Sequence, residues 1–300
     1  MGKRLGLLLW LALVGLGGCS VQTAYNNLDR LARWSVDDYV DMNRQQRAWF
    51  DQEFRRLWDW HRRTHLPEYA AFLEEAAGRL DEGVDEAYLQ EAVVRVSRWL
   101  DEIEQRGMPI AAELLASLSD EQVRHLAEAL ERSNRELAEP EEGVDTATAQ
   151  AAWRDEFADR FTDFSGRLNP VQKLYLDAQA QNYRPELVLW AEYRRRWQRD
   201  FLERLERRSD VDALERDLRR LSAERQRYFS PELIVIDAHN ERLAREISIW
   251  LVGSLTDRQR ARFQERLTEL ADDLRQLAAA ETRPRGGDPV CLVRCPNGAD

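Results

Sequence analysis

Hydrophobic residues recur at steps of three and four along most of the chain, which is the spacing of one face of an α-helix. Alternation with a period of two, the sign of a half-buried strand, is nearly absent. The clearest stripes are Trp153, Phe157, Phe161, Phe164 and Leu168; Trp190, Trp197, Phe201 and Leu205; Val211, Leu214, Leu218 and Leu221; Leu233, Ile236, Leu243, Ile247 and Trp250; and Phe263, Leu267, Leu270, Leu274 and Leu277. The pattern predicts an all-α fold, an antiparallel multi-helix bundle of about eight to ten helices joined by short loops.

Helix-breaking residues are sparse, and they mark where the predicted helices end. Six glycines and six prolines lie between residues 19 and 283, whereas the segment 282–300 is rich in both. Ser230-Pro231 has the form of an N-cap followed by proline at the first helical position. We therefore expect a helical domain over residues 19–281 and a disordered tail over 282–300. A division into two sub-bundles near residues 140–145 is the alternative to a single bundle.

Four of the predicted helix starts share one short form, an apolar residue, then Asn, Ser or Thr, two variable residues and Gln. They are Met42–Gln46, Leu118–Gln122, Leu168–Gln172 and Leu255–Gln259. This is the form of a capping box with its hydrophobic staple residue, in which the cap side chain and the glutamine each satisfy a backbone N–H. The starts are either an internal repeat or the reuse of one good helix start. Their unequal spacings of 76, 50 and 87 residues argue against a regular solenoid.

The first 19 residues predict export and a lipid anchor. Lys3 and Arg4 precede an apolar run that ends in Leu16-Gly17-Gly18-Cys19-Ser20, and this is the order of features in a secretory signal peptide, here over residues 1–18. The end of the run resembles the bacterial lipobox, which implies that Cys19 carries the acyl chains, palmitate among them, at the mature N-terminus. Several acyl chains would hold the protein on a membrane. An ordinary signal peptide with a chance cysteine is the alternative.

The net charge excludes one class of partner. The formal charge is −11, and removal of Lys3 and Arg4 with the signal peptide changes it to −11 − 2 = −13. A surface this acidic repels phosphate backbones and anionic lipid headgroups, so we expect no nucleic-acid binding.

The two remaining cysteines, Cys291 and Cys295, lie close together in the predicted tail. In an oxidising compartment they can form a disulfide, or they remain as two thiols. A metal site there would need two further ligands, and the tail has no histidine.

The chain contains no G-x-S-x-G elbow, Walker loop, G-x-G-x-x-G or H-E-x-x-H motif, and we expect neither an enzyme nor a cofactor. The best metal candidate is the pair His61 and His65, spaced by one helical turn, with Glu68 after it. Pro67 disfavours helical geometry at Leu66 and would send Glu68 in a new direction. We therefore interpret the two histidines as surface or cap residues in an arginine-rich turn and assign no metal ligand.

Other polar and aromatic groups favour structural roles. His239 and Asn240 lie beside an apolar stripe and suggest a satisfied polar pair that fixes register. Adjacent carboxylates such as Glu74-Glu75 do not face one another on a helix, which favours a solvated face over an acid/base dyad. The tryptophans at positions 34, 49, 58 and 60 lie near the anchor. They favour core packing, with contact to the membrane interface as the alternative.

Two resemblances to known proteins add to the evidence from composition and periodicity. The first is carried by Tyr25-Asn26-Asn27-Leu28-Asp29, Trp34, Asp38-Tyr39, Asp41, Gln46-Arg47, Trp60-His61-Arg62-Arg63 and Leu66-Pro67-Glu68-Tyr69-Ala70. With the lipobox, it resembles an uncharacterised family of proteobacterial lipoproteins, and it implies a helical, lipid-anchored protein without supplying catalytic residues. The second is local: Leu255-Thr256-Asp257-Arg258-Gln259 resembles the LTxxQ element of periplasmic adaptors and chaperones of the Spy and CpxP type.

Together these features predict an outer-membrane lipoprotein that faces the periplasm. Ser20 after the lipidated cysteine, with no aspartate there, fits the common sorting rule for the outer membrane. The expected role is that of a binding or scaffold protein for another envelope protein. The alternative is a chaperone-like or envelope-stress adaptor role of the LTxxQ type.

Overall fold

A computed structural model describes residue 25, residues 35–280 and residues 292–293. Within these residues the chain forms ten helices and no strand, which confirms the predicted all-α multi-helix bundle. The helices are α4 (Arg44–Glu82), α5 (Glu86–Ala116), α6 (Asp120–Ala138), α7 (Thr146–Ser165), α8 (Pro170–Ala180), α9 (Leu187–Leu205), α10 (Val211–Ala223), the 3₁₀ helix η1 (Arg225–Tyr228), α11 (Pro231–Gly253) and α12 (Asp257–Ala279). None of the helices in this part of the chain is both long and apolar enough to cross a membrane.

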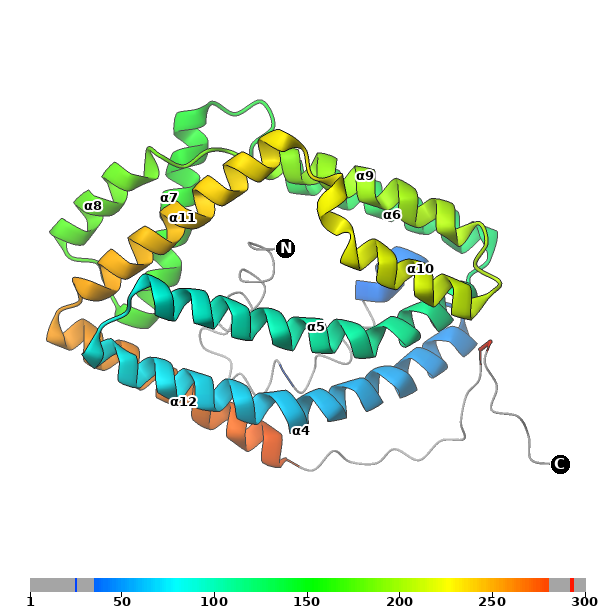
Figure 1. Cartoon of the computed structure of the whole chain (residues 1–300), viewed down its shortest axis with the longest axis horizontal. Helices are drawn as coiled ribbons and strands as arrows, with labels where there is room; N and C mark the ends of the chain where they lie inside the picture. The colour runs from blue at the N-terminus through cyan, green and yellow to red at the C-terminus, as the bar shows by residue number, and fades with distance from the viewer. Residues whose placement is uncertain (1–24, 26–34, 281–291, 294–300) are drawn as a thin grey trace.

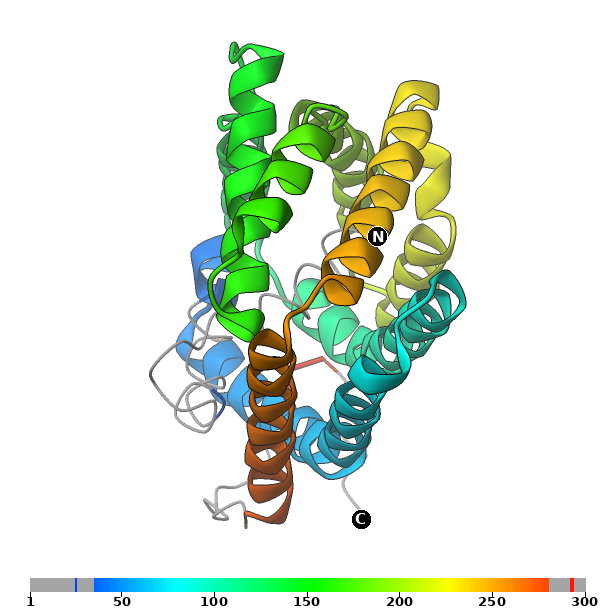
Figure 2. The same cartoon turned by 90° about the vertical axis from the view of Figure 1, so that its left-hand side faces the viewer.

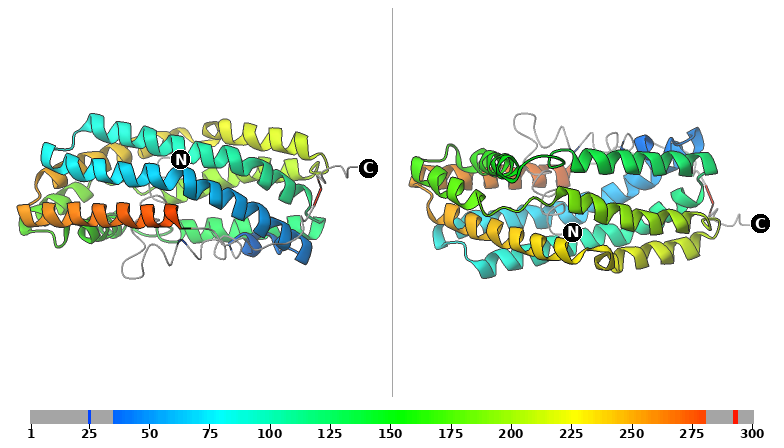
Figure 3. Two further views of the ribbon diagram at one scale, coloured as in Figure 1. Left: turned by 90° about the horizontal axis from the view of Figure 1, so that it is seen from below. Right: turned by 90° about the horizontal axis from the view of Figure 1, so that it is seen from above.

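The two longest helices, α4 and α5, run side by side along one edge of an elongated molecule (Figure 1). Helices α8 and α11 lie at one end of the long axis, and α6, α9 and α10 lie at the other. Figure 2 views the first of these ends, where α12 packs beside α4. The views from below and above in Figure 3 show most helices aligned with the long axis, as in a bundle. The edge made by α4 and α5 therefore connects the two ends.

Two prolines lie inside these long helices, Pro67 in α4 and Pro109 in α5. The expectation that Pro67 turns the chain before Glu68 is wrong, because α4 continues for 15 residues beyond Pro67, to Glu82. A proline inside a helix removes one backbone hydrogen bond and favours a bend, and α4 is bowed in Figure 1. Leu66 and Ala70, on either side of the proline, are fully buried. Burial of these flanking side chains offsets the cost of the lost hydrogen bond.

The buried hydrophobic residues form two clusters. The first joins the C-terminal half of α4 to α7, α8, α11 and α12, and it holds every residue of the 263–277 stripe. The second joins the start of α4 and the end of α5 to α6, α9 and α10, and it holds all four residues of the 211–221 stripe. Each cluster draws on helices from both sides of residues 140–145. Trp49 is buried in the second cluster beside Phe50, which confirms the predicted core role of this tryptophan.

The four repeated helix starts are complete capping boxes. In each one the cap side chain of Asn43, Ser119, Asn169 or Thr256 accepts from the N3 backbone N–H, and the N3 glutamine side chain accepts from the backbone N–H of the cap. The apolar residue before each cap is buried, namely Met42, Leu118, Leu168 and Leu255. The prediction of capping boxes with staple residues is therefore confirmed at all four positions.

The starts also pair with one another, the first with the second and the third with the fourth. Gln46 Nε2 donates to the Ser117 carbonyl at 3.0 Å, and Gln122 Nε2 donates to the Asp41 carbonyl at 2.9 Å and to Gln46 Oε1 at 2.7 Å. We call this arrangement the 46/122 junction. It holds the start of α4 against the turn between α5 and α6.

The second pair repeats this arrangement bond for bond. Gln172 Nε2 donates to the Ser254 carbonyl at 3.1 Å, and Gln259 Nε2 donates to the Arg167 carbonyl at 3.0 Å and to Gln172 Oε1 at 2.9 Å. We call this the 172/259 junction. The two junctions lie at opposite ends of the long axis, each beside its own hydrophobic cluster (Figure 1). The four similar sequences are thus two copies of one two-part helix junction.

Candidate functional site

The polar residues singled out from the sequence gather in the middle of α4. His61 and His65 lie one turn apart with ring centroids 5.3 Å apart, and both are buried, His65 completely. The interpretation of these residues as surface or cap histidines is therefore wrong. The reason is that aromatic rings of α4 itself and of the upstream Tyr25 cover them: Tyr25 and Trp58 stack near His61, and Trp60 meets His65 edge-on.

Both ring nitrogens of His61 bind tyrosine hydroxyls. Tyr25 Oη lies 3.0 Å from Nδ1, and Tyr69 Oη lies 3.3 Å from Nε2. Burial, and secondarily the neighbouring His65, lower the pKa of His61 to about 4. Burial also raises the pKa of both tyrosines above the ordinary value of 10. The three groups therefore form an uncharged hydrogen-bonded chain at neutral pH.

The neighbouring polar contacts tie α4 to α5. His65 Nε2 lies 3.0 Å from a carboxylate oxygen of Glu102. Glu68 accepts from Trp99 Nε1 at 2.6 Å and from the Arg98 guanidinium at 3.0 Å. Trp99 is almost completely buried. The carboxylates of Glu68 and Glu102 thus fix the crossing of the two long helices.

The structure does not bring His61, His65 and Glu68 together as metal ligands. The Glu68 carboxylate is directed at Trp99 and Arg98, and His61 is bonded to the two tyrosines. Within the described part of the chain, no group of three His, Cys, Asp or Glu residues has a geometry that suits a metal ion. The arrangement instead suits a structural role, which is to hold Tyr25 and α5 against α4.

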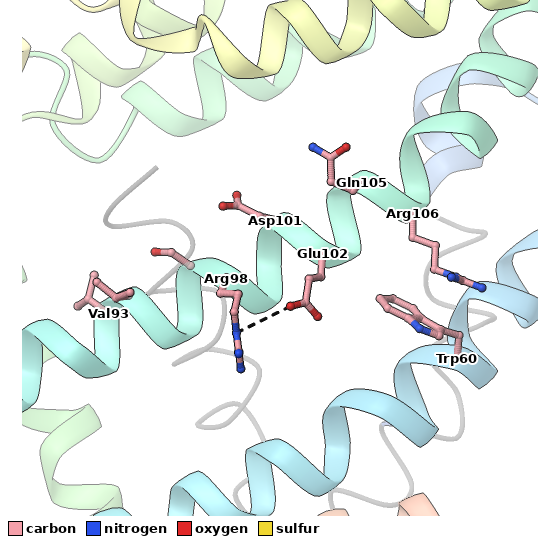
Figure 4. A pocket seen from close by; sticks show the side chains of 9 residues that line it. Trp60, Val93, Arg98, Asp101, Glu102, Gln105 and Arg106 are labelled. Atoms are coloured by element: carbon pink, nitrogen blue, oxygen red, sulfur yellow. Dashed lines mark ion pairs between the residues drawn. The ribbon is translucent and has the colours of Figure 1, made fainter.

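Beside this cluster an open depression runs along α5, with a volume of about 750 Å³. It is lined by Trp60 of α4 and by Val93, Val94, Ser97, Arg98, Asp101, Glu102, Gln105 and Arg106 of α5. Figure 4 shows Arg106 beside Trp60, with its guanidinium carbon 4.8 Å from the ring centroid, and the Arg98–Glu102 ion pair of 3.8 Å. Val93 and Val94 are 57% and 69% exposed. Val93 lies at the end of the depression opposite Trp60 (Figure 4). Two adjacent valines this exposed form an apolar spot that can serve as a contact surface.

The residues of α5 that line this depression do not stand out in the amino-acid sequence. Val93-Val94 looks like core sequence, and only the packing of α5 shows that both side chains stay outside. A helix with one solvated face buries only one stripe, so two adjacent valines beside further apolar residues were the available signal that one of them stays outside.

Other polar side chains lie as the sequence predicts. Asn240 is completely buried and exchanges hydrogen bonds with the backbone of Arg184. The half-buried His239 bonds to the Asn182 carbonyl at 2.8 Å, so both members of the pair are satisfied, as predicted. Glu74 pairs with Arg275 and Glu75 with Arg95, so adjacent carboxylates are directed to different helices, as expected for a solvated face. Cys19, Trp34, Cys291 and Cys295 lie outside the described residues.

The fold and this site define an all-helical protein with a buried histidine–aromatic cluster and an open groove on its longest helices. The family model described as "Family of unknown function (DUF6279)" matches residues 38–234, which is 197 of 300 residues. The chain therefore belongs to this family. The matched segment contains α4, α5 and the whole of the depression. Neither the comparison with curated proteins nor the comparison with solved structures finds a match.

Proposed function

We propose that the protein is a lipid-anchored envelope protein that works by binding another envelope protein along α5, without catalysis. The observation that carries this proposal is the pair of exposed valines, Val93 and Val94, at the rim of the open depression. The neighbouring side chains include charges of both signs, Arg98, Asp101 and Arg106. Such a surface suits a partner segment with an apolar centre and flanks of mixed charge, for example the side of a helix.

The anchor part of the proposal is supported by residues 1–19, which have the order of a signal peptide and lipobox. Acyl chains on Cys19 would hold the domain on the periplasmic side of the outer membrane. Replacement of Cys19 by alanine should abolish labelling with radioactive palmitate and release the protein from the membrane fraction. Retention of the alanine variant on membranes, with palmitate still incorporated, would contradict the anchor.

Two residues of the C-terminal tail, Leu292 and Val293, contact the helical domain. Leu292 packs against the second hydrophobic cluster, and the Val293 N–H donates to the Glu113 carboxylate at 2.6 Å. We propose that Cys291 and Cys295, which flank these residues, form a disulfide in the oxidising periplasm. Thiol labelling after purification without reductant should leave both cysteines unmodified and should modify both after reduction.

A chaperone-like role, implied by the LTxxQ resemblance, receives less support. The glutamines of all four LTxxQ-like starts are engaged in hydrogen bonds within the chain. Helix capping and packing within this chain therefore explain why the LTxxQ-like sequences occur, without a chaperone role. A protein with this role should suppress the aggregation of an unfolded client at near-stoichiometric ratios, and we expect no such suppression.

The partner surface is tested by a photoreactive amino acid placed at Val94 in cells. We expect one reproducible crosslinked envelope protein, because the side chain at position 94 stands at the rim of the groove. Val171, on α8, is a matched control, since it is also a valine and is 66% exposed. Binding along α5 would be contradicted if position 171 gave the same adduct in equal amount. It would also be contradicted if the substitution Val93→Asp left the amount of adduct at position 94 unchanged.

A further inference from the structure

We propose that the exposed side of the first half of α4 faces the membrane, and that Arg55, Arg56 and Arg63 contact anionic lipid headgroups there. This inference rests on the proposed anchor at Cys19. It adds to that proposal a defined orientation of the domain and a lipid-contacting surface.

The first observation is the attachment of Tyr25 to the middle of α4. The ring of Tyr25 is buried, with its centroid 4.4 Å from that of Trp58, and its hydroxyl lies 3.0 Å from His61 Nδ1. The Arg62 guanidinium carbon lies 5.2 Å from the Tyr25 ring centroid. Three side chains of α4 thus hold this residue, and with it the chain that leads to the anchor.

The second observation is the length of chain between Tyr25 and Cys19, which is six residues. Six residues span at most about 20–22 Å when fully extended. A helix with its side chains is about 10–12 Å wide, so a membrane lying against α4 is within reach of the acyl chains. Helix α11 lies across the molecule from α4 (Figure 1). The tether therefore favours α4 over α11 as the membrane-facing element.

The third observation is a local excess of positive charge at this place in an acidic protein. Residues 44–65 of α4 contain six arginines and three acidic residues, a formal charge of +3, whereas residues 66–82 contain one arginine and five acidic residues, a charge of −4. The whole chain carries −11. Anionic headgroups attract such a segment at short range even though the net charge of the protein is negative, because salt screens the more distant charges.

Three of these arginines are exposed and lie on one side of the helix. Arg56 and Arg63 are seven residues apart, close to two helical turns, and Arg55 is adjacent to Arg56. Arg55 and Arg63 have no ion pair or hydrogen bond within the described part of the chain, and Arg56 pairs with Glu53 of the same helix. Against the described residues, two guanidinium groups are thus available to bind phosphate oxygens, and the third is held there by an exposed ion pair of small strength.

The orientation is tested with the full-length lipidated protein in vesicles of neutral lipid that contain phosphatidylglycerol. A photoreactive amino acid at position 63 should crosslink to lipid, whereas one at position 235, an exposed valine at the start of α11, should not. Lipid adducts at 235 and none at 63, in a protein that incorporates palmitate, would overturn the orientation and leave the anchor intact. Absence of palmitate would overturn both.

The headgroup contact is tested with the unlipidated domain, residues 20–300. The triple variant Arg55→Gln, Arg56→Gln and Arg63→Gln should bind phosphatidylglycerol vesicles on the order of 100-fold more weakly, since each arginine contributes about fivefold near an anionic surface. The control variant Arg199→Gln, Arg216→Gln and Arg258→Gln makes the same change in net charge with exposed arginines on α9, α10 and α12. Equal loss of binding in both triple variants, or no loss in either, would overturn the proposal.

Discussion

Replacement of Gln172 by alanine should lower the free energy of unfolding by about 2–4 kcal/mol, and the loss should depend on Gln259 but not on Gln46. Gln172 is completely buried, and its amide accepts from the Asn169 N–H at 2.9 Å and donates to the Ser254 carbonyl at 3.1 Å. Removal of the side chain deletes these bonds and leaves buried donors and acceptors unpaired, each at a cost of about 1–3 kcal/mol.

The pairing within a junction is measured by a double-mutant cycle in urea. The double variant Gln172→Ala and Gln259→Ala should cost less than the sum of the single variants by about 1–2 kcal/mol, because the two amides bond to each other. Gln46 and Gln172 belong to different junctions, so their effects should add to within about 0.5 kcal/mol.

A surface glutamine provides the matched control for this cycle. Gln90 on α5 is exposed, and among the described residues its side chain bonds to Glu86 of its own helix alone. The variant Gln90→Ala should change the stability by less than about 0.5 kcal/mol. Full additivity of the Gln172 and Gln259 variants would show that the glutamines act as independent helix caps, and the paired-junction interpretation would then be wrong.

The contrast between caps and junctions explains how much of this fold could be predicted. A capping box is local, since its two hydrogen bonds join residues three apart, and the sequence therefore predicted all four. The junction joins residues 76 or 87 positions apart. No local pattern encodes which starts meet. The similarity of Ser117-Leu118-Ser119-Asp120 to Ser254-Leu255-Thr256-Asp257 was visible, but its meaning depended on the packing of α5 and α11.

The errors at the centre of α4 have the same origin. A local rule about proline predicted a break before Glu68, but burial of Leu66 and Ala70 keeps the helix continuous. Neighbouring arginines suggested exposed histidines, whereas Trp99 on α5 and Tyr25 far upstream help to cover the surrounding cluster. In each case residues distant in sequence decided the environment, and periodicity within one helix contains no information about them.

The second large effect expected is a loss of stability as the pH falls from 7.5 to 4.5, caused by His61. The pKa of this residue is about 4 in the folded protein, against an ordinary value of 6.5. Between these values the unfolded chain binds the proton and the folded chain does not, so protonation favours unfolding and stability rises with pH. The contribution of His61 is complete above about pH 6.5 and falls by about 2–3 kcal/mol on acidification to pH 4.5.

The variant His61→Gln should remove most of this pH dependence, because glutamine keeps a polar group near the Tyr25 and Tyr69 hydroxyls but does not titrate. Urea unfolding at pH 7.5 and pH 4.5 gives the two free energies for each protein. His125→Gln is the matched control, since this histidine on α6 is only half buried and bonds to a single backbone carbonyl, that of Asp38. The control should retain the pH dependence of the native chain. If His61→Gln lost as much stability on acidification as the control does, then His61 would not be the group that is buried in its neutral form. Protonation of His61 would then not weaken its contact with the Tyr25 hydroxyl, and the attachment of Tyr25 to α4 would not depend on pH.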